Sequence, residues 1–149
     1  MATTMANEQA VRRLFEEISA GNMDVIDQIV APDYQLHPLI YQPVPPPGAE
    51  NASGREIFKA IMTMNRRQVP DMRYTIEKLV PGDDYVTVVV RSDGHRDGQS
   101  VTGHAISLYR FTNGTIAEGW TMVDRLGTFQ QLHIVPDTLE LQRKAGMRS

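Results

Sequence analysis

The sequence predicts an α+β fold, in which helices from the first half of the chain pack on an antiparallel sheet formed by the second half. Apolar residues before Pro70 recur at helical spacing, whereas the chain from Met72 to Asp124 alternates like strands and is broken by short polar turns. Such segregation is typical of α+β folds rather than of parallel βαβ units. A strongly curved sheet with helices on one face forms a cone, whose interior holds either packed side chains or a ligand.

Three helices are expected in the first half of the chain. The first follows a cap at Asn7 and carries an inward-facing stripe of Val11, Leu14, Phe15 and Ile18. A short second helix ends before Pro32 and buries Val25, Ile26, Ile29 and Val30. The third begins after Ser53, which forms a capping box with Glu56, and its buried stripe contains Ile57, Phe58, Ile61 and Met62.

The segment between the second and third helices is expected to border a pocket. Tyr34 to His37 alternates like a short strand that stops at Pro38, so that His37 lies beside a loop. The loop, residues 38–52, contains five of the nine prolines and has no periodicity. A stiff connection of this length is suited to the rim of a binding site.

Four long strands are expected after the helices. They span Met72 to Val80, Tyr85 to Ser92, Val101 to Phe111 and Thr115 to Asp124. We expect the last turn, Thr112 to Gly114, to have three residues and a G1 bulge, which places His104 opposite Met122. A two-residue turn would move His104 to the opposite face from Asp124, so the predicted site depends on this bulge.

One face of the last two strands carries the candidate site. In the expected register it consists of His104, Ile106, Leu108, Arg110, Ile116, Glu118, Trp120, Met122 and Asp124. Asp124 ends a run of apolar neighbours within reach of His104, an arrangement suited to a carboxylate that moves protons in a pocket. Donors to a developing oxyanion could be His37, His104 or Arg110, and an apolar substrate could contact Tyr34, Leu108, Trp120 and Met122.

Several of these residues also have a purely structural interpretation. Asp124 could cap the turn that begins at Arg125, Arg110 could form an ion pair with Glu118, and Trp120 could be a core residue. The four histidines lack the H-x-H or H-E-x-x-H spacing of metal ligands, so no metal is expected. Both interpretations of Asp124 remain open on the residues alone.

Composition limits what the chain can be. It has 149 residues, a formal charge of -3 and no cysteine, which predicts one domain without disulfides or thiol nucleophiles and without a bias toward nucleic acid. We expect residues 1–6 to be a flexible N-terminus and residues 133–149 to be a C-terminal tail. Since neither a signal peptide nor a membrane-spanning apolar stretch is present, a cytoplasmic location is expected.

Three segments resemble the SnoaL-like polyketide cyclase (ester cyclase) family. They are YQLHP at residues 34–38, the Pro70-Asp71 pair that enters the first long strand, and RFTNGTIAEGWTMVDRLGTFQQL at residues 110–132. Together with the order of elements, the resemblance covers nearly all of residues 8–132. It implies a cystatin-like cone, with three N-terminal helices packed on a strongly curved antiparallel sheet that encloses a pocket.

The resemblance also implies an activity. Characterised cyclases of this family use an aspartate at the end of the last strand as general acid/base for a cofactor-free intramolecular aldol closure, and that residue corresponds to Asp124. The histidine that assists it there corresponds by position to Arg110, whereas His104 lies elsewhere on the same strand. The resemblance therefore predicts a cyclase or isomerase that acts on a hydrophobic, polyketide-like carbonyl compound.

Two other functions share the same cone. A small epoxide hydrolase of the limonene type needs two carboxylates that flank an arginine, and only Asp124 and Arg110 fit that pattern. A non-catalytic protein that binds a small ligand would not need an acid in its pocket, because an unpaired buried carboxylate is costly.

The face opposite Asp124 predicts a homodimer. It carries Val101, Ala105, Tyr109, Phe111, Ala117 and Val123, with Ser107, Thr115 and Thr121 as small polar breaks. An antiparallel sheet with one solvated face normally alternates apolar and polar residues, so apolar residues on both faces indicate that both are covered. If the helices cover the site face, we expect a second subunit to cover this one.

Overall fold

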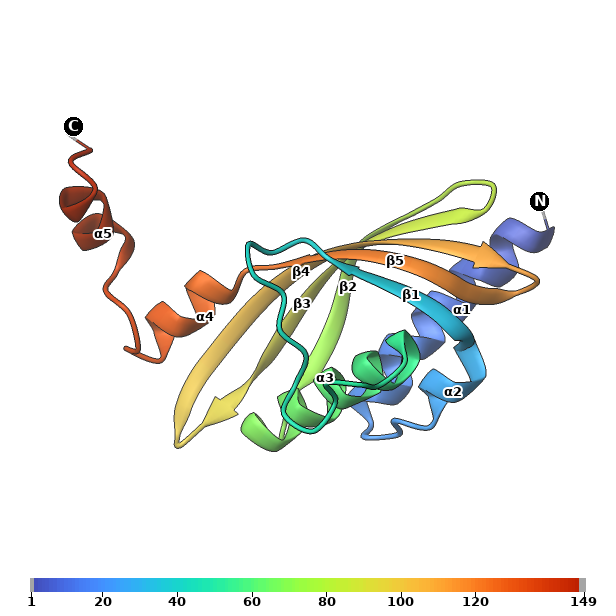
Figure 1. Cartoon of the computed structure of the whole chain (residues 1–149), viewed down its shortest axis with the longest axis horizontal. Helices are drawn as coiled ribbons and strands as arrows, with labels where there is room; N and C mark the ends of the chain where they lie inside the picture. Colours follow the sequence, from blue (N-terminus) through green and yellow to red (C-terminus); the bar gives the residue numbers. More distant parts are fainter. Residues whose placement is uncertain (1, 148–149) are drawn as a thin grey trace.

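The computed structural model describes residues 2–147 and has an α+β architecture, as expected. Five strands form one sheet in the order β1-β5-β4-β3-β2, in which β1 runs parallel to β5 and the other neighbours are antiparallel. Figure 1 shows α1, α2 and α3 packed beneath this curved sheet, while α4 and α5 extend beyond its end. The elements are α1 (Ala2–Ser19), α2 (Val25–Ile29), β1 (Val30–Pro38), α3 (Gly54–Gln68), β2 (Arg73–Pro81), β3 (Tyr85–Arg96), β4 (Gln99–Thr112), β5 (Thr115–Val123), α4 (Arg125–Gln131) and α5 (Thr138–Lys144).

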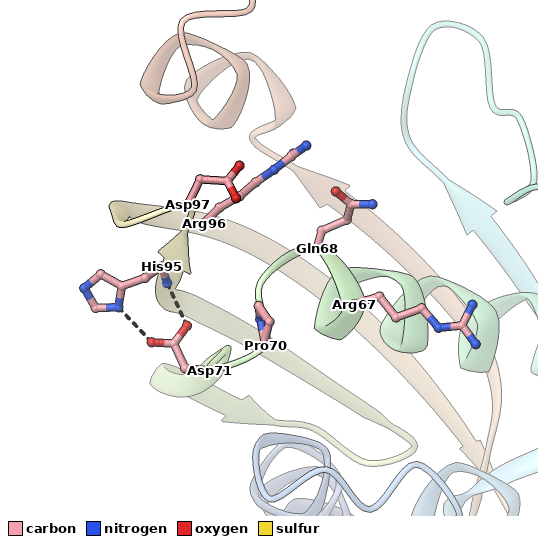
Figure 2. A pocket seen from close by; sticks show the side chains of 7 residues that line it. All are labelled: Arg67, Gln68, Pro70, Asp71, His95, Arg96 and Asp97. Carbon is pink, nitrogen blue, oxygen red and sulfur yellow. Dashed lines mark hydrogen bonds and ion pairs between the residues drawn. The ribbon is translucent and has the colours of Figure 1, made fainter.

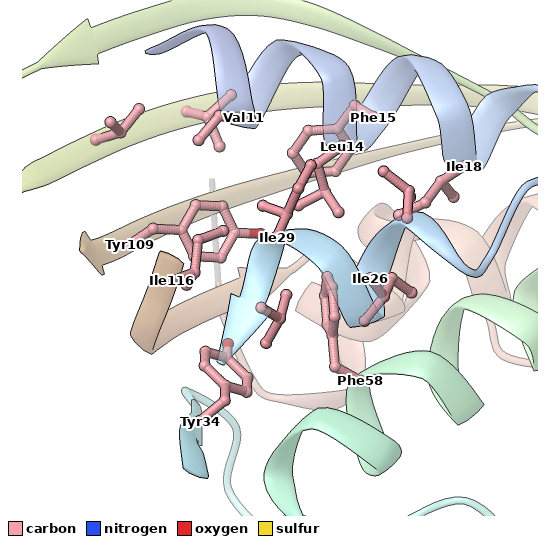
Figure 3. Packing of buried hydrophobic residues seen from close by; sticks show 14 of the residues in the cluster. Val11, Leu14, Phe15, Ile18, Ile26, Ile29, Tyr34, Phe58, Tyr109 and Ile116 are labelled. Atoms are coloured by element: carbon pink, nitrogen blue, oxygen red, sulfur yellow. The ribbon is translucent and has the colours of Figure 1, made fainter. Parts of the chain in front are cut away.

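The core lies between α1, α2 and the face of the sheet that these helices cover, which we call the inner face. Its sheet residues are Val86, Val88, Val90, Tyr109, Phe111 and Ile116, and its helix residues include Val11, Leu14, Ile18 and Ile26. Figure 3 shows Tyr109 and Ile116 in one cluster with residues of α1 and α2. Burial of these large side chains is the main stabilising contribution to the fold.

The predicted turn between β4 and β5 is wrong. Asn113 and Gly114 both have positive φ angles, 51° and 81°, and Thr112 pairs directly with Thr115, which describes a two-residue turn. Asn-Gly is the residue pair that such a turn favours. The extra residue lies instead within β5, because Phe111 pairs with Ile116 while Arg110 pairs with Glu118.

This bulge preserves most of the predicted grouping. Arg110 lies opposite Glu118, Leu108 opposite Trp120 and Ile106 opposite Met122, so these side chains share one face with His104. Ile116 lies before the bulge and belongs to the buried inner face. The one-residue shifts in the turn and in the strand therefore add to two residues, which keeps each side chain on its predicted face, but the predicted pairing of His104 with Met122 is wrong because Ile106 lies opposite Met122.

The two faces of the sheet are exchanged relative to the prediction. Tyr109 is only 2% exposed and packs in the core, with Val101 and Phe111 also buried. The face of Ile106 and Met122, predicted to line a pocket, is open, and we call it the outer face. Alternation showed that both faces are apolar, but it did not show which one the helices cover. The large residues at the centre of the patch assigned to a dimer interface are thus buried beneath the helices, although Val123 at its end is exposed, and dimerisation itself stays a prediction.

The ends of the chain also differ from expectation. α1 begins at Ala2 rather than at a cap on Asn7, and the Asn7 side chain is buried within the helix. α4 was not predicted as a helix, because its sequence has no apolar stripe. Within the predicted C-terminal tail, Asp137 caps α5, because its side chain accepts a hydrogen bond from the backbone N–H of Glu140. No helix among residues 2–147 has the length and apolar character needed to cross a membrane.

Candidate functional site

Asp124 immediately follows β5 and is the N-cap of α4. Its Oδ1 accepts a hydrogen bond of 2.8 Å from the backbone N–H of Gly127, and its side chain is exposed. A Cβ added at Gly127 would lie 2.2 Å from Oδ2, so only glycine leaves room for the carboxylate in this position. The structural interpretation of Asp124 as a cap is confirmed, and the expectation that it lines an apolar interior is wrong.

His104 lies on the neighbouring strand, directly beside Asp124. The backbone N–H of Asp124 donates to the carbonyl of His104 over 3.0 Å. The His104 side chain is oriented toward Glu77, with 3.8 Å between Nε2 and Oε1. Within residues 2–147 no hydrogen bond or ion pair joins the two side chains, so the backbone rather than a side-chain contact brings the predicted catalytic pair together.

A second group of predicted residues lies on the outer face near the β4–β5 turn. Glu118 accepts from Arg110 Nε at 3.3 Å and lies 3.2 Å from Nε2 of His37. The His37 ring stacks on Trp120, with 5.0 Å between ring centroids and 14° between planes. Hydrogen bonds from His37 and then Arg110 hold the pKa of Glu118 below its usual value. The ion pair expected between Arg110 and Glu118 is confirmed.

The remaining predicted residues do not converge on one pocket. Leu108 and Met122 lie on the outer face, Leu108 half-buried beside Trp120 and Met122 exposed. Tyr34 is buried in the core against Phe58, and its hydroxyl has no hydrogen-bond partner within the described chain. Burial raises the pKa of the Tyr34 hydroxyl. Contact between Tyr34 and a substrate on the outer face is therefore excluded by its position.

A pocket that the sequence did not indicate lies where the β3–β4 hairpin meets the end of α3. It has a volume of about 530 Å³ and is lined by Arg67, Gln68, Pro70, Asp71, His95, Arg96 and Asp97. Asp71 accepts hydrogen bonds from the backbone N–H and from Nδ1 of His95, each 2.7 Å long (Figure 2). Figure 2 shows the Arg67 side chain pointing away from this pair, so the polar groups do not focus on one ligand position.

The Pro-rich loop packs against α3. Pro46 is buried, and together with Pro47 it borders a groove of about 640 Å³ along Lys59, Ala60, Thr63 and Met64. The loop thus borders a hollow, as expected of a rim, but the hollow lies along α3 and Asp124 does not line it. Whether a ligand enters this groove stays a prediction.

The chemistry available at the end of β5 is that of an oriented carboxylate. One oxygen of Asp124 is held by Gly127, while no hydrogen bond to the other oxygen is formed within the described chain. Met122 and Leu126, both exposed apolar residues, flank Asp124 in the chain. A carboxylate with one restrained oxygen beside apolar surface can accept a proton from a hydrophobic ligand.

Comparisons with known proteins identify the family. The sequence model of the SnoaL-like polyketide cyclase family matches residues 8–132. A candidate polyketide cyclase from Bacillus cereus has a TM-score of 0.75 and 26% identity, over 87% of this chain and 82% of that one. IdmH, a candidate polyketide cyclase from Streptomyces antibioticus, has a TM-score of 0.72 and 21% identity, over 85% of this chain and 98% of that one.

A SnoaL-like candidate cyclase from Jannaschia has a TM-score of 0.72 and 23% identity, over 89% of this chain and 94% of that one. A comparison with curated proteins found no significant match. These solved structures share the cone fold with our chain, and the family match extends over most of its length. The chain therefore belongs to the SnoaL-like polyketide cyclase family.

Proposed function

We propose that the chain is a cofactor-independent cyclase or isomerase that acts on a hydrophobic, polyketide-like carbonyl compound, with Asp124 as general acid/base. The observation that carries the proposal is the Asp124 carboxylate at the end of β5, held through Oδ1 by the backbone of Gly127. The similar structures described as candidate polyketide cyclases support the substrate class. A cytoplasmic location belongs to the same proposal.

In the proposed reaction, Asp124 removes a proton from a carbon atom next to a carbonyl group. The resulting enolate attacks a second carbonyl carbon of the same molecule, and the new alkoxide takes the proton back from Asp124, which restores the carboxylate. His104, on the strand beside Asp124, supplies the hydrogen bond that stabilises the developing oxyanion. Holding the two reacting ends of one molecule close together contributes further acceleration.

The apolar part of the substrate contacts the outer face in this proposal. Met122 and Leu108 provide the apolar surface next to Asp124, and Trp120 with its stacked His37 lies farther along the strand. Aromatic and aliphatic side chains of this kind bind flat, apolar molecules. Arg110 has a different task, because its guanidinium group is engaged by Glu118 and by Thr112.

The pairing of Arg110 disfavours an epoxide hydrolase. Such an enzyme needs an arginine between two carboxylates at one site. Arg110 binds Glu118 near the β4–β5 turn, whereas Asp124 lies beyond the opposite end of β5. The three groups therefore do not form one catalytic unit in this chain.

The test begins with a panel of hydrophobic carbonyl compounds, from which ligands are selected by the increase in melting temperature. Selected compounds are incubated with the protein in buffer without added cofactor, and products are separated and weighed by mass spectrometry. A product of unchanged mass indicates aldol closure or another isomerisation, and the loss of one water indicates that dehydration has followed the closure. We expect the wild type to form such a product and Asp124→Asn to lose it. Equal turnover by both proteins would reject the proposed role of Asp124.

A further inference from the structure

The Pro-rich loop and α3 border a hollow that the proposed reaction does not use, and we call it the α3 groove. Phe58 and Met62 direct one side of α3 into the core. The groove lies along the opposite side of the helix, where Ala60, Thr63 and Met64 follow one another at helical spacing. Its volume of about 640 Å³ is typical of a site for a small molecule.

The loop side of the groove is apolar and stiff. Pro46 is buried where the loop packs on α3, and Pro47 borders the groove beside it. The fixed φ angle of proline restricts this wall before any ligand arrives, so little conformational entropy is lost on binding. Tyr41 and Val44, earlier in the same loop, are 95% and 76% exposed. The loop thus provides an apolar wall and carries further apolar side chains that its own chain leaves uncovered.

Three charged residues border the groove, and only one of them is free to bind a ligand. The Nζ of Lys59 donates to Asp24 at 3.0 Å and to Asp27 at 2.8 Å. The Glu56 carboxylate is part of the capping box of α3. Arg67, by contrast, forms no side-chain hydrogen bond or ion pair within residues 2–147. Its guanidinium group is therefore the unpaired charge of the groove.

The charges give the groove a direction. Glu56 lies in the first turn of α3 and Arg67 in its last turn, about 16 Å apart along the helix axis. A negatively charged group is repelled by Glu56 and attracted by Arg67, so an anionic ligand lies in one orientation. Ala60 and Met64 lie between these ends and offer an apolar surface. The groove therefore suits a molecule that is apolar along its length and anionic at one end.

Arg67 is suited to a carboxylate in particular. Its planar guanidinium group can donate two parallel hydrogen bonds to the two oxygens of one carboxylate. Arg67 also borders the pocket near His95, yet Figure 2 shows its side chain pointing away from His95 and Asp71. The guanidinium group is therefore available to a ligand in the α3 groove.

We propose that the α3 groove is a second binding site, which takes a small molecule with an apolar chain and one terminal carboxylate, such as a free medium-chain fatty acid. Arg67 binds the carboxylate, and the apolar chain lies between Pro46 of the loop and Met64 of α3. Asp124 does not line this groove, so the site is separate from the proposed catalytic site. The proposal therefore does not depend on the proposed catalytic activity.

The first test compares octanoate with its uncharged analogue octanol, each titrated into the full-length chain and followed by NMR. We expect the wild type to bind octanoate at one saturable site, and Arg67→Gln to bind it about tenfold or more weakly, while the affinity for octanol stays the same. Arg67 is exposed, so circular dichroism should show an unchanged fold.

Arg96→Gln is the matched control, because Arg96 lines the pocket at the β3–β4 hairpin but not the α3 groove. It should leave the affinity for octanoate unchanged. The proposal is overturned if the wild type shows no saturable binding of octanoate, if Arg67→Gln binds it as well as the wild type does, or if both substitutions weaken it equally.

The second test locates the bound octanoate. Met64 borders the α3 groove and Met122 lies on the outer face of the sheet, so their methyl NMR signals report on two different surfaces. We expect octanoate to shift the signal of Met64 and to leave that of Met122 in place. Ala60→Trp, on the side of α3 away from the core, should obstruct the groove and abolish binding at an unchanged melting temperature. A shift confined to Met122, or binding that a folded Ala60→Trp retains, overturns the groove as the site.

Discussion

Gly127 and Asp124 act as one unit at the end of β5. A Cβ at position 127 would lie 2.2 Å from Oδ2 and 2.9 Å from Cγ of Asp124. We therefore predict that Gly127→Ala displaces the carboxylate and removes the cap, which costs about 1 kcal/mol of unfolding free energy. Urea denaturation measures this loss. Thr128→Ala is the control, since its hydroxyl contacts only the backbone carbonyl of Asp124 and leaves the carboxylate in place. Equal stability of Gly127→Ala and wild type would contradict the account.

Tyr109 distinguishes the inner face from the outer face. Its ring is fully buried beneath the helices, and burial raises the pKa of its hydroxyl to about 12. We predict that Tyr109→Glu prevents folding, because it places an unpaired charge in the core at a cost of several kcal/mol. The loss of the cooperative thermal transition measures this effect, and Tyr109→Phe should retain the transition. If Tyr109→Glu instead gave a folded monomer, that result would support the prediction from the sequence that this face forms a dimer interface.

At the residue scale, the sequence could predict contacts that depend on near neighbours. The Asp124 cap involves Gly127, three positions away, and the pairing of Arg110 with Glu118 crosses one hairpin. The hydrogen bonds from His95 to Asp71 could not be predicted, because they join segments 24 residues apart whose relative position depends on the packing of α3. The Pro70-Asp71 pair carries part of the family resemblance, but no local pattern indicates that Asp71 pairs with His95.

The start of α3 depends on its capping box. The side chain of Ser53 accepts from the backbone N–H of Glu56, whose carboxylate accepts from the backbone N–H of Ser53 at 2.8 Å. We predict that Ser53→Ala lowers the unfolding free energy by about 1 kcal/mol, while Ser53→Asp retains most of it. Chemical denaturation of the three proteins measures the difference. An unchanged midpoint for Ser53→Ala would show that tertiary packing alone fixes this end of the helix.

The β3–β4 hairpin is attached to the end of α3 by Asp71. Hydrogen bonds from the His95 ring and backbone hold the pKa of Asp71 below its usual value. The stabilisation is thus present above the ordinary aspartate pKa of about 3.9 and is lost as the pH falls through the lower folded value. We predict that Asp71→Ala lowers the melting temperature near neutral pH and that the difference disappears in strong acid. The exposed Asp83→Ala is the control, and a difference independent of pH would contradict this explanation.

At the element scale, the four C-terminal strands and the three N-terminal helices could be predicted, whereas β1 begins at Val30, inside the expected second helix, and one register detail could not be predicted. The sequence Thr112-Asn113-Gly114-Thr115 fits both a three-residue and a two-residue turn. The structure uses the latter and places the bulge in β5, where Arg110 pairs with Glu118 and Phe111 with Ile116. Packing of Phe111 and Ile116 in the same core favours that choice, and such packing is not visible in a local pattern.

At the scale of the whole molecule, the sequence could predict a helix layer on a curved sheet but not which face of the sheet the helices cover. Both faces of β4 carry large apolar residues, with Tyr109 and Phe111 on one and Ile106 and Leu108 on the other. The alternation of side chains along a strand shows which residues share a face, but it does not show which face the helices cover. Val86, Val88 and Val90 of β3 form one continuous buried patch with Tyr109 and Phe111, and this patch identifies the covered face. The patch can be recognised only when the pairing of β3 with β4 is known.

The central claim is that Asp124 transfers protons in addition to capping α4. These two roles can be separated, because asparagine also accepts a hydrogen bond at an N-cap but cannot act as a base at neutral pH. The most direct measurement is exchange of the α-protons of bound ketones and ketoesters with D₂O, followed by NMR for the wild type and for Asp124→Asn. We predict exchange that the wild type accelerates and that Asp124→Asn slows by about 100-fold or more, at an unchanged melting temperature. Equal exchange rates for the two proteins would contradict the claim.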